Sequence, residues 1–139
     1  MFVRYALLGD AVNRTSGKWN LIGNFNVIWA RTLPTNHPEM GILVRLEADH
    51  REAGAHSLQL DFVDETGARL SGPDPVPFDL AEPPVAGFPL SFDIGLDIRN
   101  LEIPKAGNYD FVVRVDGVYL DSVPLYVRAI ADHPGGKAK

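Results

Sequence analysis

His50 and His56 are the histidines whose spacing comes closest to a reactive cluster. They flank the Ala-Gly pair at 53–54, which is predicted to form a turn, so their imidazoles could approach each other beside Asp49 or Glu52. Nitrogen and oxygen ligands grouped in this way could hold a metal ion at the surface. The spacing matches no metal-binding motif, however, and we interpret these histidines as solvated turn residues.

Acidic side chains suggest a calcium site, which needs about six to eight oxygen ligands around one ion. Several of them, such as Asp93 and Asp97, fall at alternate positions on predicted outward faces of strands. Arginines occupy similar outward positions, so cross-strand ion pairs account for most of the pattern. We therefore predict no metal site. The acids at loop ends, where ligands could converge, are Asp64, Glu65, Asp116 and Asp121.

No motif for covalent or nucleotide chemistry is present. The sequence contains no cysteine, no G-x-S-x-G and no G-x-G-x-x-G, the patterns of a nucleophile elbow and of a dinucleotide-binding loop. Glycoside hydrolysis needs two carboxylates at a set separation, and nothing in the sequence selects a pair. We therefore predict that the protein is not an enzyme and needs no cofactor. A metal-dependent hydrolase is the least favoured function.

The segment 18–29, which reads KWNLIGNFNVIW, contains the strongest candidates for ligand binding. In a single strand over 18–30, the aromatic residues share one face and the asparagines the other. A row of side-chain amides beside aromatic rings could bind a sugar or a peptide by hydrogen bonds and stacking. In the alternative interpretation, the aromatics belong to the core and the asparagines lie on a wet face. The candidate ligand-binding residues are Asn20, Asn24 and Asn26.

Alternation of apolar and polar residues is the dominant pattern that would position these side chains. It runs through 42–49, 57–63, 88–98 and 109–116, and it indicates half-buried strands with one solvent-exposed face. The Asp-Gly pair at 116–117 predicts a type I′ hairpin turn. No window shows the spacing of an amphipathic helix.

Short strands separated by turns are typical of an antiparallel β-sandwich. We predict an all-β fold: a single antiparallel β-sandwich of seven to nine strands, immunoglobulin-like or C2-like, with a barrel as the less favoured alternative. The sandwich is expected to span residues 1–130, and residues 131–139 to form a flexible C-terminal tail.

Some residues interrupt the strict alternation. Ile98 and Leu101 both face inward at a spacing of three, as do Leu120 and Val123, and each pair predicts a bulge or a bend in its strand. Glycines within strand patterns mark bulges or close approaches of neighbouring backbone. The two glycines predicted to do so are Gly9 and Gly23.

The connection 71–87 is long and rich in proline, and long loops often carry function. It could form the contact surface for a partner. In the alternative interpretation, residues 76–80 form a short edge strand that the prolines protect against aggregation. The candidate interface residues of this loop are Pro73, Pro75, Pro77, Phe78, Pro83 and Pro84.

Composition restricts the partners. The chain has 139 residues and a net charge of −5, which argues against general binding to nucleic acid or to anionic lipid. No apolar run approaches the roughly 20 residues of a membrane-spanning helix. The apolar stretch after Arg4 is too short for a secretory signal. We therefore expect one cytoplasmic domain without nucleic-acid or membrane partners.

Several segments resemble a group of small bacterial proteins catalogued as a domain of unknown function. The resemblance covers residues 3–128 and implies a β-sandwich from bacteria or their phages, without implying an activity or catalytic residues. The segments that carry it are LLGDA at 7–11, SGK at 16–18, LIG at 21–23, LDFVDETG at 60–67, the run from Pro104 through Gly107 and Tyr109 to Phe111, DG at 116–117 and LYV at 125–127.

Two functions from different classes follow from these observations. The first is a non-catalytic interaction module that binds a protein partner or a second copy of itself, as a homodimer, through an edge strand or the 71–87 loop. The second is a small-ligand or carbohydrate-binding sandwich that uses the asparagines of 18–30. The predicted fold does not select between them.

Overall fold

The computed structural model describes residues 1–135, and the chain over this range is built from β-strands and two short 3₁₀ turns. The predicted all-β class is confirmed. The strands are β1 (Phe2–Gly9), β2 (Ala11–Thr15), β3 (Lys18–Ile22), β4 (Val27–Ala30), β5 (Thr35–Ala48), β6 (Gly54–Val63), β7 (Arg69–Ser71), β8 (Val76–Leu80), β9 (Leu90–Ile103), β10 (Gly107–Val115) and β11 (Val118–Ala129), and the 3₁₀ turns are η1 (His50–Glu52) and η2 (Ile130–Asp132).

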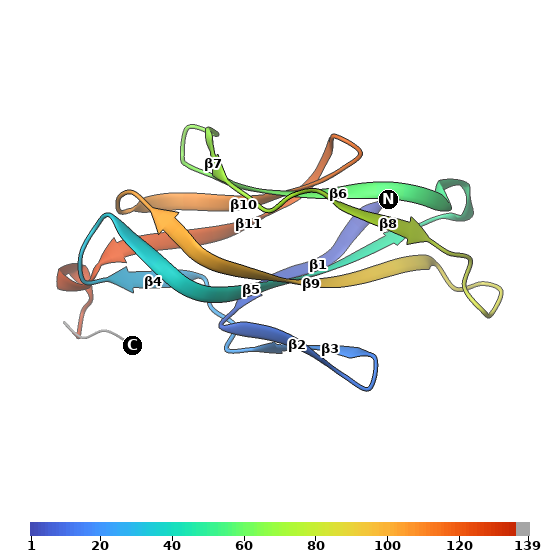
Figure 1. Cartoon of the computed structure of the whole chain (residues 1–139), viewed down its shortest axis with the longest axis horizontal. Helices are drawn as coiled ribbons and strands as arrows, with labels where there is room; N and C mark the ends of the chain where they lie inside the picture. Colours follow the sequence, from blue (N-terminus) through green and yellow to red (C-terminus); the bar gives the residue numbers. More distant parts are fainter. Residues whose placement is uncertain (136–139) are drawn as a thin grey trace.

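The eleven strands of residues 1–135 form three sheets (Figure 1). One sheet has the order β1-β5-β9, and a larger one has the order β4-β11-β10-β6-β7 with β8 also paired to β6. The third is the β2–β3 hairpin. Strand pairing is antiparallel except between β4 and β11, which run parallel. The prediction of a single antiparallel sandwich of seven to nine strands therefore gave too few strands, and it did not foresee the separate hairpin or the parallel pair.

Strand β6 is the element that organises the larger sheet. It pairs with β10 along one edge, whereas its other edge is shared by β8 at one end and β7 at the other. In Figure 1, β8 and β7 accordingly lie at opposite ends of β6. The prediction of a short edge strand at 76–80 is confirmed, because these residues form β8.

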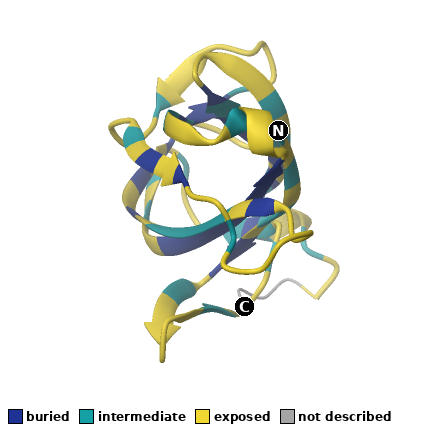
Figure 2. Cartoon of the chain, turned by 90° about the vertical axis from the view of Figure 1, so that its right-hand side faces the viewer, coloured by how far each residue is buried: buried dark blue, intermediate teal, exposed yellow. Residues whose placement is uncertain are grey.

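The apolar core lies between the two larger sheets. Inward side chains of β5 and β9 face those of β6, β10 and β11. Phe62 stacks on Tyr109 and packs at a tilt against Phe111, with ring centroids 5.0 Å apart in each pair. Figure 2 shows buried segments around the interior and a largely exposed β2–β3 hairpin below it. Phe88 begins the alternating pattern 88–98, whose apolar residues were expected to face inward, but it precedes β9 and is 58% exposed.

Both predicted departures from regular alternation are confirmed. Strand β9 bends at Asn100, whose φ is +53°, so that Ile98 and Leu101 are both buried. Its register with β5 is unbroken on either side of this bend. In β11 the register with β10 shifts around Leu120, which is a bulge.

The predicted tail begins within η2 and continues past it. His133 packs edge-on against Trp29 with ring centroids 4.6 Å apart. Residues 136–139, the rest of the predicted tail, lie outside the described part of the chain. Within residues 1–135, neither short helical turn could cross a lipid bilayer.

Glycines let the β2–β3 hairpin press against the outer face of the β1-β5-β9 sheet. Gly9 and Gly41 are directly paired on that face, and a Cβ at either would meet side chains of the hairpin at less than 3.0 Å. A Cβ on Gly95 would lie 2.6 Å from Cζ3 of Trp19. The Trp19 indole also donates to the carbonyl of Asp93 at 3.2 Å. The predicted close approach at Gly9 is therefore confirmed.

Substitution Gly95→Ala should displace the hairpin, because the added methyl overlaps the Trp19 ring. We expect the free energy of unfolding to fall by about 1–3 kcal/mol, as for other overpacked sites, and Trp19 fluorescence to shift toward that of an exposed indole. Urea denaturation checks the first effect and emission spectra the second. In a Trp19→Ala background, Gly95→Ala should lower the free energy of unfolding by less, because the ring that the added methyl meets is absent. An equal loss in both backgrounds would contradict the proposed clash.

Candidate functional site

An open groove lies between the two larger sheets where β7 faces β9. Strand β9 pairs with β5 along one edge, and no strand within residues 1–135 pairs with its other edge. Two hollows of about 710 and 330 Å³ lie along this seam and share Ser71 and Glu102. We call this the β7–β9 groove, with residues 70–73 on one wall and residues 97–104 on the other.

A buried carboxylate holds the β7 wall in place. Asp61 of β6 is only 4% exposed at its side chain, and it accepts hydrogen bonds from Arg69 at 2.7 Å, Arg114 at 2.8 Å and Gln59 at 3.0 Å. Burial alone would raise the pKa of Asp61, but the hydrogen bonds and charges of these partners outweigh it and lower the pKa below its ordinary value. Because Arg69 belongs to β7, this network ties the three-residue strand to the sheet.

The groove combines an apolar floor with acidic groups at its rim. Buried Phe62 and Phe111 lie beneath it, and Leu70 at its wall is 39% exposed. Asp97 and Glu102 form no ion pair with another described residue of the chain, whereas Arg99 pairs with Glu39 at 3.7 Å. The groove thus offers a free strand edge, apolar surface and unpaired negative charge.

The predicted strand over 18–30 is wrong, because it breaks after Ile22. Gly23 has a φ of +69°, and a Cβ there would run into the carboxylate of Asp10. The asparagines therefore share no strand face. Asn20 lies in the β2–β3 hairpin and donates to Asn13 at 3.0 Å and Thr15 at 2.8 Å.

Asn24 and Asn26 both line another hollow of about 520 Å³, which we call the Asn24–Trp29 cleft. Asp10, Trp29 and His37 also line it. The amide of Asn24 donates to the carbonyl of Leu8 at 2.8 Å. Burial lowers the pKa of His37, an effect that the Asp10 charge only partly offsets. Sequence reasoning grouped Trp29 with the asparagines in the segment 18–29 but missed Asp10 and His37 as their neighbours.

The proline-rich segment separates into three parts. Pro73 lines the β7–β9 groove, while Pro77 and Phe78 belong to β8. Phe78 is only 7% exposed and stacks on Phe92 with centroids 4.4 Å apart, so its side chain belongs to the core and not to an exposed loop surface. Pro75 is exposed ahead of β8, and Pro83 and Pro84 line a separate hollow of about 410 Å³.

The residues considered for a metal site do not converge. Within residues 1–135, no three acidic or histidine side chains are grouped to hold a metal ion. Asp64 accepts hydrogen bonds from its own turn, Glu65 accepts from the backbone of Asn108 at 2.7 Å, and His50 contacts Glu82 at 2.6 Å. Asp121 bonds the backbone N–H of Ser122.

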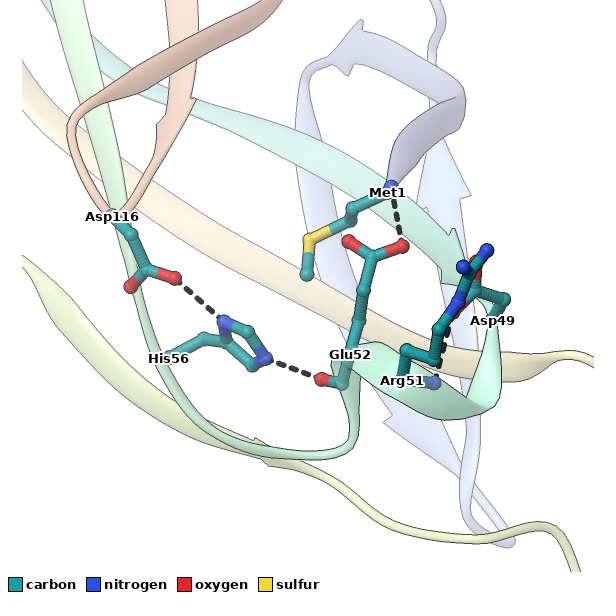
Figure 3. Close-up of polar contacts among 6 residues, drawn as sticks. All are labelled: Met1, Asp49, Arg51, Glu52, His56 and Asp116. Atoms are coloured by element: carbon teal, nitrogen blue, oxygen red, sulfur yellow. Dashed lines mark hydrogen bonds and ion pairs between the residues drawn. The ribbon is translucent and has the colours of Figure 1, made fainter.

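His56 instead links two turns of the fold (Figure 3). Its Nδ1 lies 2.6 Å from a carboxylate oxygen of Asp116, and its Nε2 lies 2.6 Å from the carbonyl oxygen of Glu52. Both partners are acceptors, so both ring nitrogens must donate, which requires the imidazolium. The hydrogen bond with Asp116 is the main cause that raises the pKa of His56. With a side chain 15% exposed, His56 is not the solvated turn residue expected.

These features define an all-β protein with the open β7–β9 groove, the Asn24–Trp29 cleft and no grouped metal ligands among its described residues. The chain belongs to DUF6941, a family of unknown function whose model matches residues 4–128. This confirms the resemblance to an uncharacterised family.

Comparison with curated proteins gives no match. A putative β-galactosidase from Bacteroides fragilis is similar over 68% of this chain, with a TM-score of 0.39 and 20% identity. The alkylpurine DNA glycosylase AlkC of Pseudomonas fluorescens, solved bound to DNA containing an abasic site analog, is similar over 75%, with a TM-score of 0.42 and 18% identity. The chain spans only 15% and 28% of the lengths of these two proteins.

Stability should fall as the pH rises through the folded-state pKa of His56. This pKa is raised above the ordinary value near 6.5. The stabilisation is therefore fully present below about pH 6.5 and is lost as the pH rises from there through the raised pKa. Urea denaturation between pH 5 and 9 measures the effect. His56→Gln should flatten this part of the profile, and a variant with an unchanged slope would contradict the assignment.

Asp61→Asn should lower the free energy of unfolding by about 1–3 kcal/mol, because charged hydrogen bonds to two arginines are lost. The cost stays below that of a fully buried ion pair, since Arg69 and Arg114 both reach solvent. Asp110→Asn on the adjacent strand is the matched control. Burial raises the pKa of Asp110, so removing its charge should be neutral or stabilising. Equal losses for both variants would contradict the role of Asp61.

Proposed function

We propose that this protein is a non-catalytic interaction module that binds an extended segment of a protein partner in the β7–β9 groove. One observation carries the proposal: the long edge of β9 is unpaired among the described residues and faces the short strand β7 across an open groove.

Backbone pairing would supply the affinity. An exposed strand edge presents N–H and C=O groups that another extended chain can pair with, and known modules bind peptides by adding a strand in this way. A segment of about six residues would span about 20 Å, which matches the stretch 97–103 of β9. Its alternate side chains would point toward Leu70 and the aromatic floor.

Charge and shape favour a basic segment of another protein over a second copy of this chain. Asp97 and Glu102 lack described ion-pair partners, so a lysine or arginine in the segment would find complementary charge. Two β9 edges placed together would bring these acids near each other, and the bend at Asn100 disturbs a long flat pairing. A short flexible segment can follow the bend.

The other parts of this proposal come from the sequence. A bacterial, cytoplasmic protein without nucleic-acid, membrane or cofactor partners remains our prediction, as does the immunoglobulin-like or C2-like classification of the two larger sheets. A metal-dependent hydrolase remains the least favoured function.

A displayed library of random seven-residue peptides tests the proposal. We expect it to enrich extended sequences with a lysine or arginine, and we expect Leu70→Glu and Glu102→Lys each to weaken the selected peptide at least tenfold. Slowed amide exchange within 97–103 on binding would report the added strand. Val118→Glu, which alters an exposed apolar residue away from the groove, is the matched control.

Three results would overturn the proposal. The first is a library without any enriched peptide, and the second is binding that Leu70→Glu leaves unchanged while the variant remains folded. The third is a concentration-dependent dimer of the unliganded chain that Leu70→Glu or Glu102→Lys dissociates, which would assign the groove to a second copy.

A further inference from the structure

A second cleft, on the far side of β5 from the β7–β9 seam, has a different chemistry. The Asn24–Trp29 cleft brings together side chains from three parts of the chain: Asp10 after β1, the segment from Asn24 to Trp29, and His37 in β5. Its volume of about 520 Å³ lies within the roughly 300–1,000 Å³ of small-molecule sites. We propose that this cleft binds a neutral sugar.

The segment that carries the asparagines is held firmly at both ends. The N–H of Phe25 donates to the carbonyl of Leu8 at 3.1 Å, and the amide of Asn24 donates to the same oxygen at 2.8 Å. Farther along, the carbonyl of Asn26 accepts from the N–H of Tyr126 at 2.8 Å. Backbone and side-chain hydrogen bonds of this kind hold binding groups in one geometry before a ligand arrives.

The polar groups of the cleft match hydroxyl groups, which both donate and accept. Asp10 offers two acceptor oxygens, and Asn24 keeps its carbonyl oxygen because only its amide nitrogen is used by Leu8. The side chain of Asn26 makes no hydrogen bond to another described residue, so it offers both a donor and an acceptor. His37, with a lowered pKa, is a neutral imidazole at neutral pH, and the ring nitrogen that is not engaged with the backbone of Glu39 can accept a hydrogen bond.

Aromatic surface is available beside these polar groups. Trp29 and Phe25 are both half-buried lining residues, and Phe25 already packs at a tilt against His37 with ring centroids 6.1 Å apart. A pyranose has an apolar face of C–H groups that can stack on such a ring while its hydroxyls reach the polar groups. The combination fits a sugar better than a purely apolar ligand.

Charge excludes the anionic ligands. Among the described residues, the cleft is lined by one carboxylate, from Asp10, and by no lysine or arginine. A phosphate or carboxylate ligand would lie near a like charge without a cation of residues 1–135 to offset it. A neutral sugar carries no such penalty.

Titration with neutral monosaccharides, including glucose, galactose, mannose and N-acetylglucosamine, tests the inference, with glucose 6-phosphate as the anionic comparison. A Trp19→Phe background leaves Trp29 as the fluorescent reporter, because the sequence contains two tryptophans. We expect at least one neutral sugar to change Trp29 emission in a saturable way and the anionic sugar to bind at least tenfold more weakly.

Variants distinguish this cleft from other surfaces. Asn26→Ala removes an amide without a described structural bond and should weaken sugar binding at least tenfold, whereas Asn20→Ala, a matched amide in the β2–β3 hairpin, should leave it unchanged. Leu70→Glu should also leave it unchanged, which separates this site from the β7–β9 groove. The inference is overturned if none of the neutral sugars binds, if glucose 6-phosphate binds equally well, or if Asn26→Ala has no effect.

Discussion

Burial of one apolar interior between two sheets of unequal width is the interaction on which the rest of the structure depends. Phe62, Phe111 and Leu46 are almost completely buried, and each such side chain contributes about 1.5–3 kcal/mol relative to exposure. The β1-β5-β9 sheet has three strands, whereas the sheet that packs against it has six. At one end of the molecule, β8 closes the gap between the two sheets through the Phe78–Phe92 stack. At the other end, β7 is only three residues long, and the seam stays open.

Polar residues outside the core serve as ties between elements. Asp61 connects β6 to β7 and β10, and His56 connects the η1 turn to the β10–β11 turn. Within the described residues, every fully buried side-chain nitrogen or oxygen has a hydrogen-bond partner. Two polar side chains that line the clefts differ from these buried groups because they have no such partner within residues 1–135. The side chains of Glu102 and Asn26 have no described partner, so they remain available to a ligand.

Both clefts form where regular strand pairing stops. In the β7–β9 groove, the long strand β9 extends beyond the short strand β7 on the opposite sheet, and the backbone N–H and C=O groups at the edge of β9 have no strand partner among the described residues. In the Asn24–Trp29 cleft, the chain leaves the β2–β3 hairpin before it joins β11, and side chains are left pointing into a hollow. The first arrangement suits backbone recognition of an extended chain. The second suits side-chain recognition of a small polar molecule.

The sequence by itself determined the all-β class, most strand positions and the irregularities near Asn100 and Leu120. Alternation reports which face of a strand is buried, and these features depend on that local signal. The edge strand at 76–80 was one of two interpretations that the sequence left open. The tertiary structure alone decided that β3 ends before Gly23, where the backbone takes a φ of +69°. It also decided that Phe78 is core, that His56 is enclosed between two acceptors and that β9 keeps a free edge. These outcomes depend on contacts between segments far apart in the chain, which no local pattern records.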